Sequence, residues 1–499
     1  MNAHTHLGTA RRSVQSMIES RPAQNSGRFN SPRTPQLVAF CLATAAFLAI
    51  VMGLILGRST VDVWGAFVIP ALLLIIMIPI IRVIERQQST DLSRLLVIGL
   101  IARFIATYYR FLMEANYYGY GDAMTYFSIG HVRVDQLLTG AIPLGDFVPT
   151  GSSTTFIQNL TGPIELITGQ SSAGTFAVYS LFGFIGIWGF IGAARRAIPE
   201  INLRRYALLV LFLPTMLFWS SAIGKDAWMT MCLGILAAGA SRIFTRTRGG
   251  IVLTGIGMIG AVVCRPHIGV IAAAALLVTI VVARPRRATQ TSASPSGPLR
   301  IGLIVIAIVA LAFSLGAITS VFPKAQPFSD PASLSAISID TASQTARGNS
   351  QIEATSANQI WLYPVAFASA VFRPLIFEAR TPPSLIAAIE GTVLIALVVR
   401  WRKNVFAGLR LLRSSPYLLF ATLDGVMFFI IFASISNLGI LARQRVQGLP
   451  FILLLLAIET VAERNQLVDS SDDHGDNSQN SGPTVPPGPH ESSEASDSR

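Results

Sequence analysis

Long apolar runs with almost no charge are the feature of this sequence that most constrains its fold. Many of them approach the roughly 20 residues that a helix needs to cross a bilayer. Charged residues make up 13% of the 499-residue chain, against about 25% in a typical soluble domain. The runs are continuously apolar, whereas the strands of an outer-membrane barrel alternate. The sequence therefore excludes a soluble enzyme and a barrel, and it predicts an all-α, polytopic transmembrane helical bundle.

The apolar runs define twelve predicted spans. They lie at residues 36–57, 61–81, 95–113, 173–193, 205–222, 226–243, 250–264, 268–283, 301–321, 384–400, 416–436 and 446–462. With a cytoplasmic N-terminus, this arrangement places most basic residues in cytoplasmic segments, as the positive-inside rule requires. A further apolar stretch, 361–377, would put the basic cluster 400–413 outside if it crossed the membrane. We therefore expect this stretch to be re-entrant or interfacial, and both termini to be cytoplasmic.

Polar segments divide the chain around the predicted transmembrane domain, residues 36–462. Residues 1–35 form a polar cytoplasmic tail, and residues 463–499 are so poor in apolar side chains that we expect a disordered cytoplasmic tail. Two long external loops are expected at 114–172 and 322–360. The net charge of +12 is then explained by cytoplasmic loops and does not indicate nucleic acid. The three cysteines lie in or beside apolar runs, so we expect no disulfide framework, no metal and no cofactor.

Most of the unusual polar motifs fall on the external side of this predicted topology. Polar groups near bilayer depth are costly and usually face a cavity or a partner. Five motifs at the ends of different helices therefore predict one shared external site. They are Gly121-Asp122, Gly224-Lys225-Asp226, Arg265-Pro266-His267, Arg373-Pro374 with Glu378, and Arg443-Gln444-Arg445.

Asp122 has two interpretations, which can hold together. It follows a tyrosine-rich stretch and precedes an amphipathic run that ends at Leu138, so it can be a helix N-cap. It can also be a general base that takes the proton of an acceptor hydroxyl, with Tyr126 among rings that stack on sugar faces. The apolar face of the run is expected to lie on the membrane surface and consists of Met124, Phe127, Val134 and Leu138.

The Gly224-Lys225-Asp226 motif is not a phosphate-binding P-loop, because the other residues of that pattern are missing. It can be a tight turn in which Asp226 is favourable at a helix N-terminus. We favour a functional role, because the chain almost always uses arginine yet has Lys225 here, and a compact ammonium suits a phosphate or carboxylate. We expect Lys225 and Asp226 to be catalytic together with Asp122.

The remaining external polar residues can be interface anchors that extend toward the headgroups. Arginine is also the residue best suited to phosphate, through its planar fork, so we predict a substrate-binding set. Its members are Arg265, His267, Arg373, Glu378, Arg443, Arg445 and Tyr126.

Some charged residues lie well inside predicted spans. Arg103 and Arg110 are seven residues apart and share one helical face, and Glu390 and Asp424 lie in later spans. We expect structural ion pairs, for example Arg103 with Glu390 or Asp424. The alternative is a proton relay, which would indicate a transporter.

Four stretches carry a family resemblance: 218–226, 264–267, 372–374 and 436–445. They resemble uncharacterised polytopic membrane proteins of bacterial polysaccharide clusters, which are similar in layout to O-antigen-polymerase-like proteins and to GT-C glycosyltransferases. The resemblance implies a location in the bacterial cytoplasmic membrane, external arginines that hold an undecaprenyl-diphosphate donor, and an acidic base in a large external loop.

Chemistry and topology together lead to a functional hypothesis. Nucleotide sugars are absent outside the cell, so glycosyl transfer there needs a lipid-linked donor. We expect a membrane glycosyltransferase or polysaccharide polymerase whose partners are a polyprenyl-linked sugar, membrane lipid and other polysaccharide-assembly proteins. The alternatives are a flippase of lipid-linked sugars and a non-catalytic scaffold of a polysaccharide-assembly complex.

Overall fold

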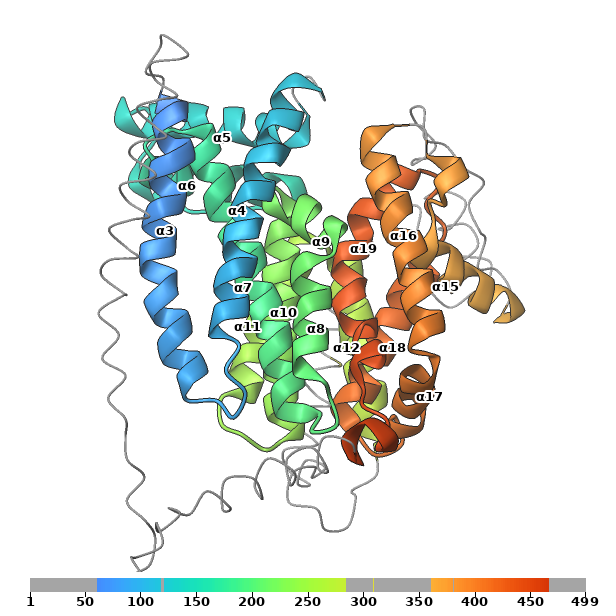
Figure 1. The fold of residues 1–499 in the computed structure, drawn as a ribbon. Coiled ribbons are helices and arrows are strands. Elements are labelled where there is room, and N and C mark those ends of the chain that lie inside the picture. Colours follow the sequence, from blue (N-terminus) through green and yellow to red (C-terminus); the bar gives the residue numbers. More distant parts are fainter. Residues whose placement is uncertain (1–60, 118–120, 284–307, 309–359, 380, 466–499) are drawn as a thin grey trace, which may run out of the picture.

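The computed structural model describes residues 61–117, 121–283, 308, 360–379 and 381–465, and its regular elements are all helices in these ranges (Figure 1). The predicted spans 36–57 and 301–321, the loop 322–360 and the two terminal tails lie outside the described residues, apart from residues 308, 360 and 463–465. The all-α prediction is confirmed for the part of the chain that is described.

Within the described residues, four helices are long and apolar enough to cross a membrane. They are α3 (Val61–Arg86), α4 (Ser93–Asn116), α7 (Ser172–Ala197) and α10 (Lys225–Phe244). Two bent pairs would raise the number to six: α8 (Leu203–Phe212) with α9 (Pro214–Phe218) and η2 (Trp219–Ser221), and α16 (Pro382–Arg400) with α17 (Arg402–Leu411). The total of twelve spans remains a prediction.

The other apolar helices are shorter. They are α11 (Gly250–Cys264), α12 (Pro266–Val282), α15 (Tyr363–Phe372) and α18 (Pro416–Phe432). Two more helices, α19 (Leu438–Ile452) and the short α20 (Leu454–Ala457), complete the described chain. At 1.5 Å per residue, the ten residues of α15 extend only about 15 Å, which is shorter than a bilayer span. The re-entrant or interfacial location of this segment stays a prediction.

The last predicted span begins earlier than the apolar run suggested. The side chain of Asn437 accepts hydrogen bonds from the backbone N–H groups of Gly439 (2.9 Å) and Ile440 (3.1 Å), which is the usual way to cap a helix N-terminus. The helix therefore starts at Leu438. This start places Arg443 and Arg445 inside the helix, although the sequence had placed them before it.

The segment predicted as an external loop at 114–172 is largely helical. It contains α5 (Asp122–Leu138), the short η1 (Leu144–Phe147) and α6 (Ser153–Thr168), and α5 packs on α6 at one end of the bundle (Figure 1). Val134 is completely buried, while Leu138 is 65% exposed. The expectation that the apolar face of α5 lies on the membrane surface is therefore wrong at Val134, because this residue packs inside the protein.

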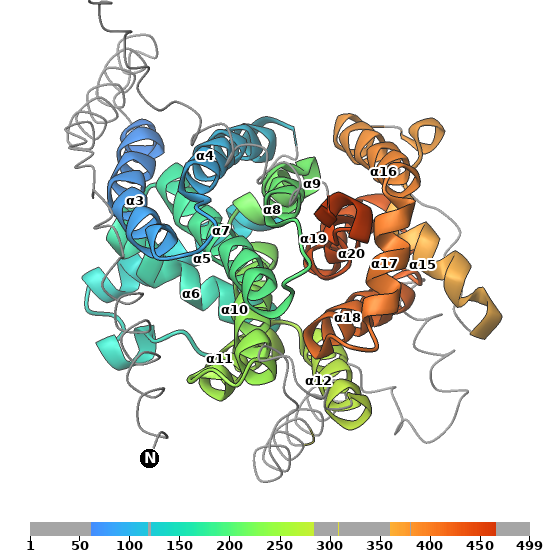
Figure 2. The same ribbon diagram turned by 60° about the horizontal axis from the view of Figure 1, so that its bottom comes forward.

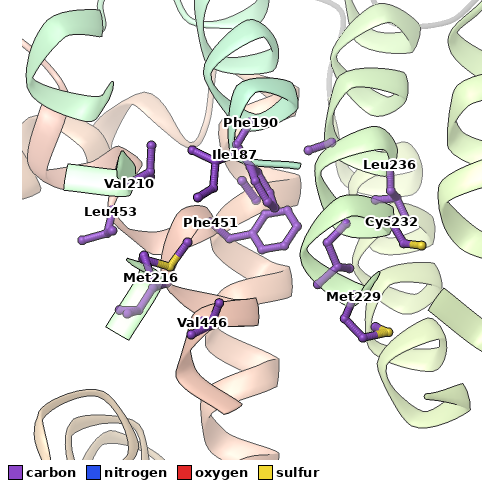
Figure 3. Close-up of a cluster of buried hydrophobic side chains, with 14 of the residues drawn as sticks. Ile187, Phe190, Val210, Met216, Met229, Cys232, Leu236, Val446, Phe451 and Leu453 are labelled. Carbon is purple, nitrogen blue, oxygen red and sulfur yellow. The ribbon is translucent and has the colours of Figure 1, made fainter. Parts of the chain in front are cut away.

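The core joins the N-terminal and C-terminal halves of the described chain. Helices α7 and α10 cross so closely that a Cβ at Gly234 would lie 2.0 Å from the carbonyl oxygen of Gly186; small residues permit this approach between membrane helices. Figure 3 shows Phe190 of α7 beside Phe451 of α19, with ring centroids 5.0 Å apart. This packing places α19 against α7 and α10 (Figure 2).

Arg103 is buried, and no carboxylate contacts it among the described residues. Its guanidinium donates to the backbone carbonyls of Ser180 (2.8 Å) and Met216 (3.2 Å) and to the carbonyl and hydroxyl of Ser220. Met216 and Ser220 lie in α9 and η2, where the helix ends before α10, and the last carbonyls of a helix have no helical partners. Arg103 satisfies them, so the expected ion pair with Glu390 or Asp424 is wrong.

Candidate functional site

A cavity of about 370 Å³ lies between α4, α5, the turn from η2 to α10, and the first turns of α16 and α19. Three of the predicted site residues line it: Asp122, Asp226 and Arg443. Its other polar and aromatic lining residues are Arg110, Glu114, Tyr117, Trp219, Thr381, Ser384 and Asn437. Segments far apart in the sequence therefore meet at the end of the bundle that carries α5.

Asp226 is the centre of a buried hydrogen-bond network beside this cavity. It is 3% exposed, and its carboxylate accepts from Arg265 (2.8 Å), from Arg443 and from the side-chain amide of Gln447 (3.3 Å). Arg265 donates in addition to the amide oxygen of Gln444 at 2.7 Å. A carboxylate with so many donors is strongly stabilised as an anion, so Asp226 is a poor proton acceptor and serves to hold the two arginines in place.

Asp122 lies in a more open environment. Its side chain is 64% exposed and accepts a hydrogen bond from the Arg443 guanidinium at 3.0 Å. The N-cap position of α5 is occupied by Gly121, and Asp122 is the first residue of the helix. Gly121 has no side chain that could cap the helix. The N-cap interpretation of Asp122 is therefore wrong. Its carboxylate points toward Arg443 and remains accessible from the cavity.

Arg443 connects the two carboxylates across the cavity wall. One edge of its guanidinium binds Asp226 and the other binds Asp122. Because α19 brings Arg443 to the N-terminus of α10, this bridge joins residues separated by more than two hundred positions. A planar guanidinium held by carboxylates on both sides is fixed in orientation, which makes it a rigid part of the site.

Lys225 and Tyr126 lie behind the cavity, between the α5–α6 layer and the bundle. The ammonium of Lys225 donates to the hydroxyl of Ser153 on α6 at 3.1 Å, and neither Lys225 nor Tyr126 lines the cavity. A Cβ at Gly224 would lie 3.6 Å from the Tyr126 ring. Burial, and next the charge of Asp122, raise the pKa of Tyr126 to about 12, so this phenol stays protonated at neutral pH.

The other predicted site residues do not line the cavity. His267 packs on Phe432, with ring centroids 5.7 Å apart, and Arg373 forms an ion pair with its near neighbour Glu378. Arg445 is completely buried; it donates to the carbonyls of Val371 (2.8 Å) and Arg373 (3.2 Å). The structure gives these residues contacts within the fold, and the predicted single site therefore includes only part of the set.

The buried contacts of Arg445 extend to the helix break at α9. Its guanidinium lies 3.7 Å from the carboxylate of Glu390. Glu390 in turn accepts from the backbone N–H (2.6 Å) and the hydroxyl of Thr215 at the start of α9. This chain of contacts ties α19 and α16, which line the cavity, to α9, which leads into the lining residue Trp219 of η2.

Sequence reasoning missed the wall of the cavity formed by α4. Arg110 forms an ion pair with Glu114 at 2.8 Å and lies over the rings of Phe218 and Trp219, 4.9 and 5.1 Å from the centroids. Arg110 and Glu114 are four residues apart, a spacing that brings helical side chains together. This spacing was the available signal, but the predicted span 95–113 included Arg110 and left Glu114 in the external loop after it.

Glu114 also holds the start of α5. Its carboxylate accepts from the backbone N–H of Ala123 at 3.3 Å, and a Cβ at Gly121 would lie 2.2 Å from the same oxygen. Only glycine allows this close approach, so Gly121 and Glu114 together fix the position of Asp122 at the cavity.

The cavity presents one exposed carboxylate, two arginines in fixed ion pairs, aromatic rings and neutral hydrogen-bonding side chains. Within the described ranges, no group of three or more His, Cys, Asp or Glu side chains could hold a metal ion. Such an arrangement can bind a polar ligand with both hydroxyl and anionic groups, and Asp122 can accept a proton from it.

Comparisons with protein-family models, with curated proteins and with solved structures found no match to this chain.

Proposed function

We propose that the protein is a membrane glycosyltransferase or polysaccharide polymerase that uses a polyprenyl-(di)phosphate-linked sugar on the external face of the cytoplasmic membrane. The observation that carries this proposal is the placement of Asp122: an exposed carboxylate in a cavity of about 370 Å³, with Arg443 directly beside it. The cavity volume is in the range of small-molecule sites, and its mixture of rings, hydroxyls and an amide suits a sugar.

In the proposed reaction, Asp122 accepts the proton of the acceptor hydroxyl as its oxygen attacks the anomeric carbon of the donor sugar. The bond from the anomeric carbon to the phosphate oxygen breaks, and the polyprenyl (di)phosphate leaves with the electron pair. The product is a new glycosidic bond. Asp122 suits the role of base because it is the lining carboxylate with the greatest exposure, whereas Asp226 is occupied by its donors.

The cations of the site suit the charge that develops on the leaving phosphate. Arg443 and Arg110 line the cavity from α19 and α4, and Lys225 and Arg265 lie behind the wall at the start of α10. Preorganised positive groups of this kind stabilise charge without reorganising during the reaction. The roles predicted for Lys225 and Arg265 therefore change from direct contact to support of Arg443 and of the local positive potential.

Replacement of Asp122 tests the base. Asp122→Asn keeps an oxygen that can accept from Arg443 but cannot take a proton, so glycan output should fall about 10²–10⁴-fold, and Asp122→Ala should lose about as much. The measurement is the surface glycan of cells in which each variant replaces the native protein, normalised to protein in the membrane. Asp135→Asn is the matched control, because Asp135 is an exposed carboxylate of the same helix, 58% accessible, that does not line the cavity. Full glycan output from Asp122→Asn would remove Asp122 from the mechanism.

One observation favours the transporter alternative. Asp424 lies within α18, is 3% exposed, and its Oδ1 has no hydrogen-bond partner in the described part of the chain. Buried ionisable groups in membrane helices often mark ion or proton pathways. A transporter should lose function with Asp424→Asn and keep it with Asp122→Asn, whereas the proposed enzyme should show the reverse pattern. A scaffold should keep function with both variants.

A further inference from the structure

Helix α17 turns sharply away from the direction of α16. It follows α16 with a single residue between them, is bent from it by 74°, and lies at the end of the bundle opposite α5 and α6 (Figure 1). A helix with this bend at the end of a span runs closer to the plane of the membrane surface than to its normal. If α16 crosses the membrane, as the sequence predicts, this bend puts α17 in the headgroup region.

One face of α17 is fixed to the protein. The side-chain amide of Asn404 donates to the backbone carbonyl of Ile458 and to the carboxylate of Glu463, both at 2.7 Å. A Cβ at Gly408 would lie 2.9 Å from the side chain of Leu455. These contacts determine which side of α17 faces outward.

The outward side carries apolar residues among cations. Phe406 is 62% exposed and Leu409 is 43% exposed. Four exposed cations lie around them: Arg402, Lys403, Arg410 and Arg413. Within the described residues, none of these four forms an ion pair, whereas the nearby Arg205 is paired with Glu463 at 3.1 Å.

We propose that α17 is a binding site for the headgroups of anionic phospholipids. Phe406 and Leu409 would enter the boundary between headgroups and acyl chains, and the four cations would contact lipid phosphates. An amphipathic helix with large apolar residues and a basic polar face binds membranes in this way, and arginine forks bind phosphate through paired hydrogen bonds. The unpaired charge matches an anionic lipid surface, and the bend holds the helix at the depth where that surface lies. This inference does not depend on the proposed glycosyl transfer.

Lipid retention by the purified full-length protein tests the proposal. The probes are dioleoylphosphatidylglycerol and dioleoylphosphatidylcholine, added in equal amounts in detergent, and native mass spectrometry measures which of them stays bound. The wild-type protein should retain the anionic lipid preferentially. Each basic residue near an anionic surface strengthens binding by roughly fivefold, so neutralising all four in the variant Arg402→Gln, Lys403→Gln, Arg410→Gln, Arg413→Gln should reduce the preference at least about tenfold.

A second set of four exposed arginines provides the matched control. They belong to other segments that are predicted to be cytoplasmic, and the control variant is Arg86→Gln, Arg94→Gln, Arg204→Gln, Arg248→Gln. It removes the same charge and should keep most of the lipid preference. A variant with Arg402, Arg410 and Arg413 changed to lysine keeps the charge and should also keep most of the lipid preference.

The outcomes separate the proposal from its alternatives. Equal retention of phosphatidylglycerol by the wild type and the neutralised α17 variant would overturn it and leave a protein partner as the occupant of this face. An equal loss in the control variant would also overturn it, because the preference would then reflect total charge. Elution at the wild-type volume in size exclusion confirms that each variant is folded. If the neutralised variant fails this check, the single variants Lys403→Gln and Arg410→Gln provide the same comparison. Each should reduce the preference for the anionic lipid roughly fivefold.

Discussion

Removal of the Asp226 carboxylate tests whether this residue is a structural centre, as its contacts indicate, or the catalytic group that the sequence predicted. The change Asp226→Ala deletes the acceptor of two guanidiniums and one amide. Arg443 keeps Asp122 as a partner at 3.0 Å, whereas Arg265 keeps only the neutral Gln444 at 2.7 Å. Arg265 is 7% exposed, so the variant contains one buried charge without a counterion.

The magnitude follows from this count. Breaking a buried ion pair by removing one partner costs about 3–5 kcal/mol, while neutral hydrogen bonds between membrane helices average about 0.6 kcal/mol. The broken ion pair therefore makes the larger contribution to the loss of stability. Because Arg443 keeps Asp122 as a partner, the expected loss lies near the lower limit of the ion-pair range. The free energy of unfolding of Asp226→Ala should therefore fall by about 3 kcal/mol.

Unfolding in mixed micelles of a mild detergent and dodecyl sulfate, followed by circular dichroism, measures this loss. The double variant Asp226→Ala, Arg265→Ala removes the unpaired charge as well, so it should be more stable than Asp226→Ala alone. Asp135→Ala is the control, because changes at exposed positions are usually within about 0.5 kcal/mol. A loss below about 1 kcal/mol for Asp226→Ala, or no recovery in the double variant, would refute the charge argument.

Three further predictions concern the α5–α6 layer and the topology. Gly121→Ala places a methyl group against the Glu114 carboxylate, where the Cβ would be 2.2 Å from an oxygen. Glycan output should therefore fall about tenfold or more without loss of membrane insertion. Wild-type output would contradict the proposed positioning of Asp122. Burial raises the pKa of Glu165 from an ordinary value of 4.5 to about 8. The contribution of the Glu165 carboxyl to stability is complete below pH 4.5 and is lost as the pH rises through about 8. A pH series of unfolding experiments should show this decline in the wild type and a smaller decline in Glu165→Gln. Reporter fusions at residues 150 and 246 should read external and cytoplasmic respectively, and the same side for both would contradict the predicted topology.

Local sequence patterns determined the helical class and most helix positions. The length of an apolar run acts through the chain itself, so α3, α4, α7 and α10 lie close to the predicted spans. The helical run that begins at Asp122 was also visible, because its apolar spacing is a property of the local sequence.

The sequence also selected several residues of the candidate site without showing which of them share it. Asp122, Asp226 and Arg443 were correctly grouped as neighbours, and the structure places them around one cavity. Arg445 was grouped with them because it is close in the chain. A helix turns about 100° per residue. Arg445, two positions after Arg443 on α19, therefore lies on a different side of the helix, where it is completely buried.

The partners of the charges were decided only by the tertiary structure. Nothing near Arg103 in the sequence shows that its guanidinium meets carbonyls at the break before α10. Likewise, the pairing of Arg443 with both Asp122 and Asp226 depends on how α19 packs against α10 and α5. The sequence by itself determined that these polar residues lie in or beside apolar helices, because composition and periodicity are local. Which of them remains accessible, and which is neutralised inside the fold, was decided by helix packing, because an ion pair depends on distances between segments that the chain order does not set.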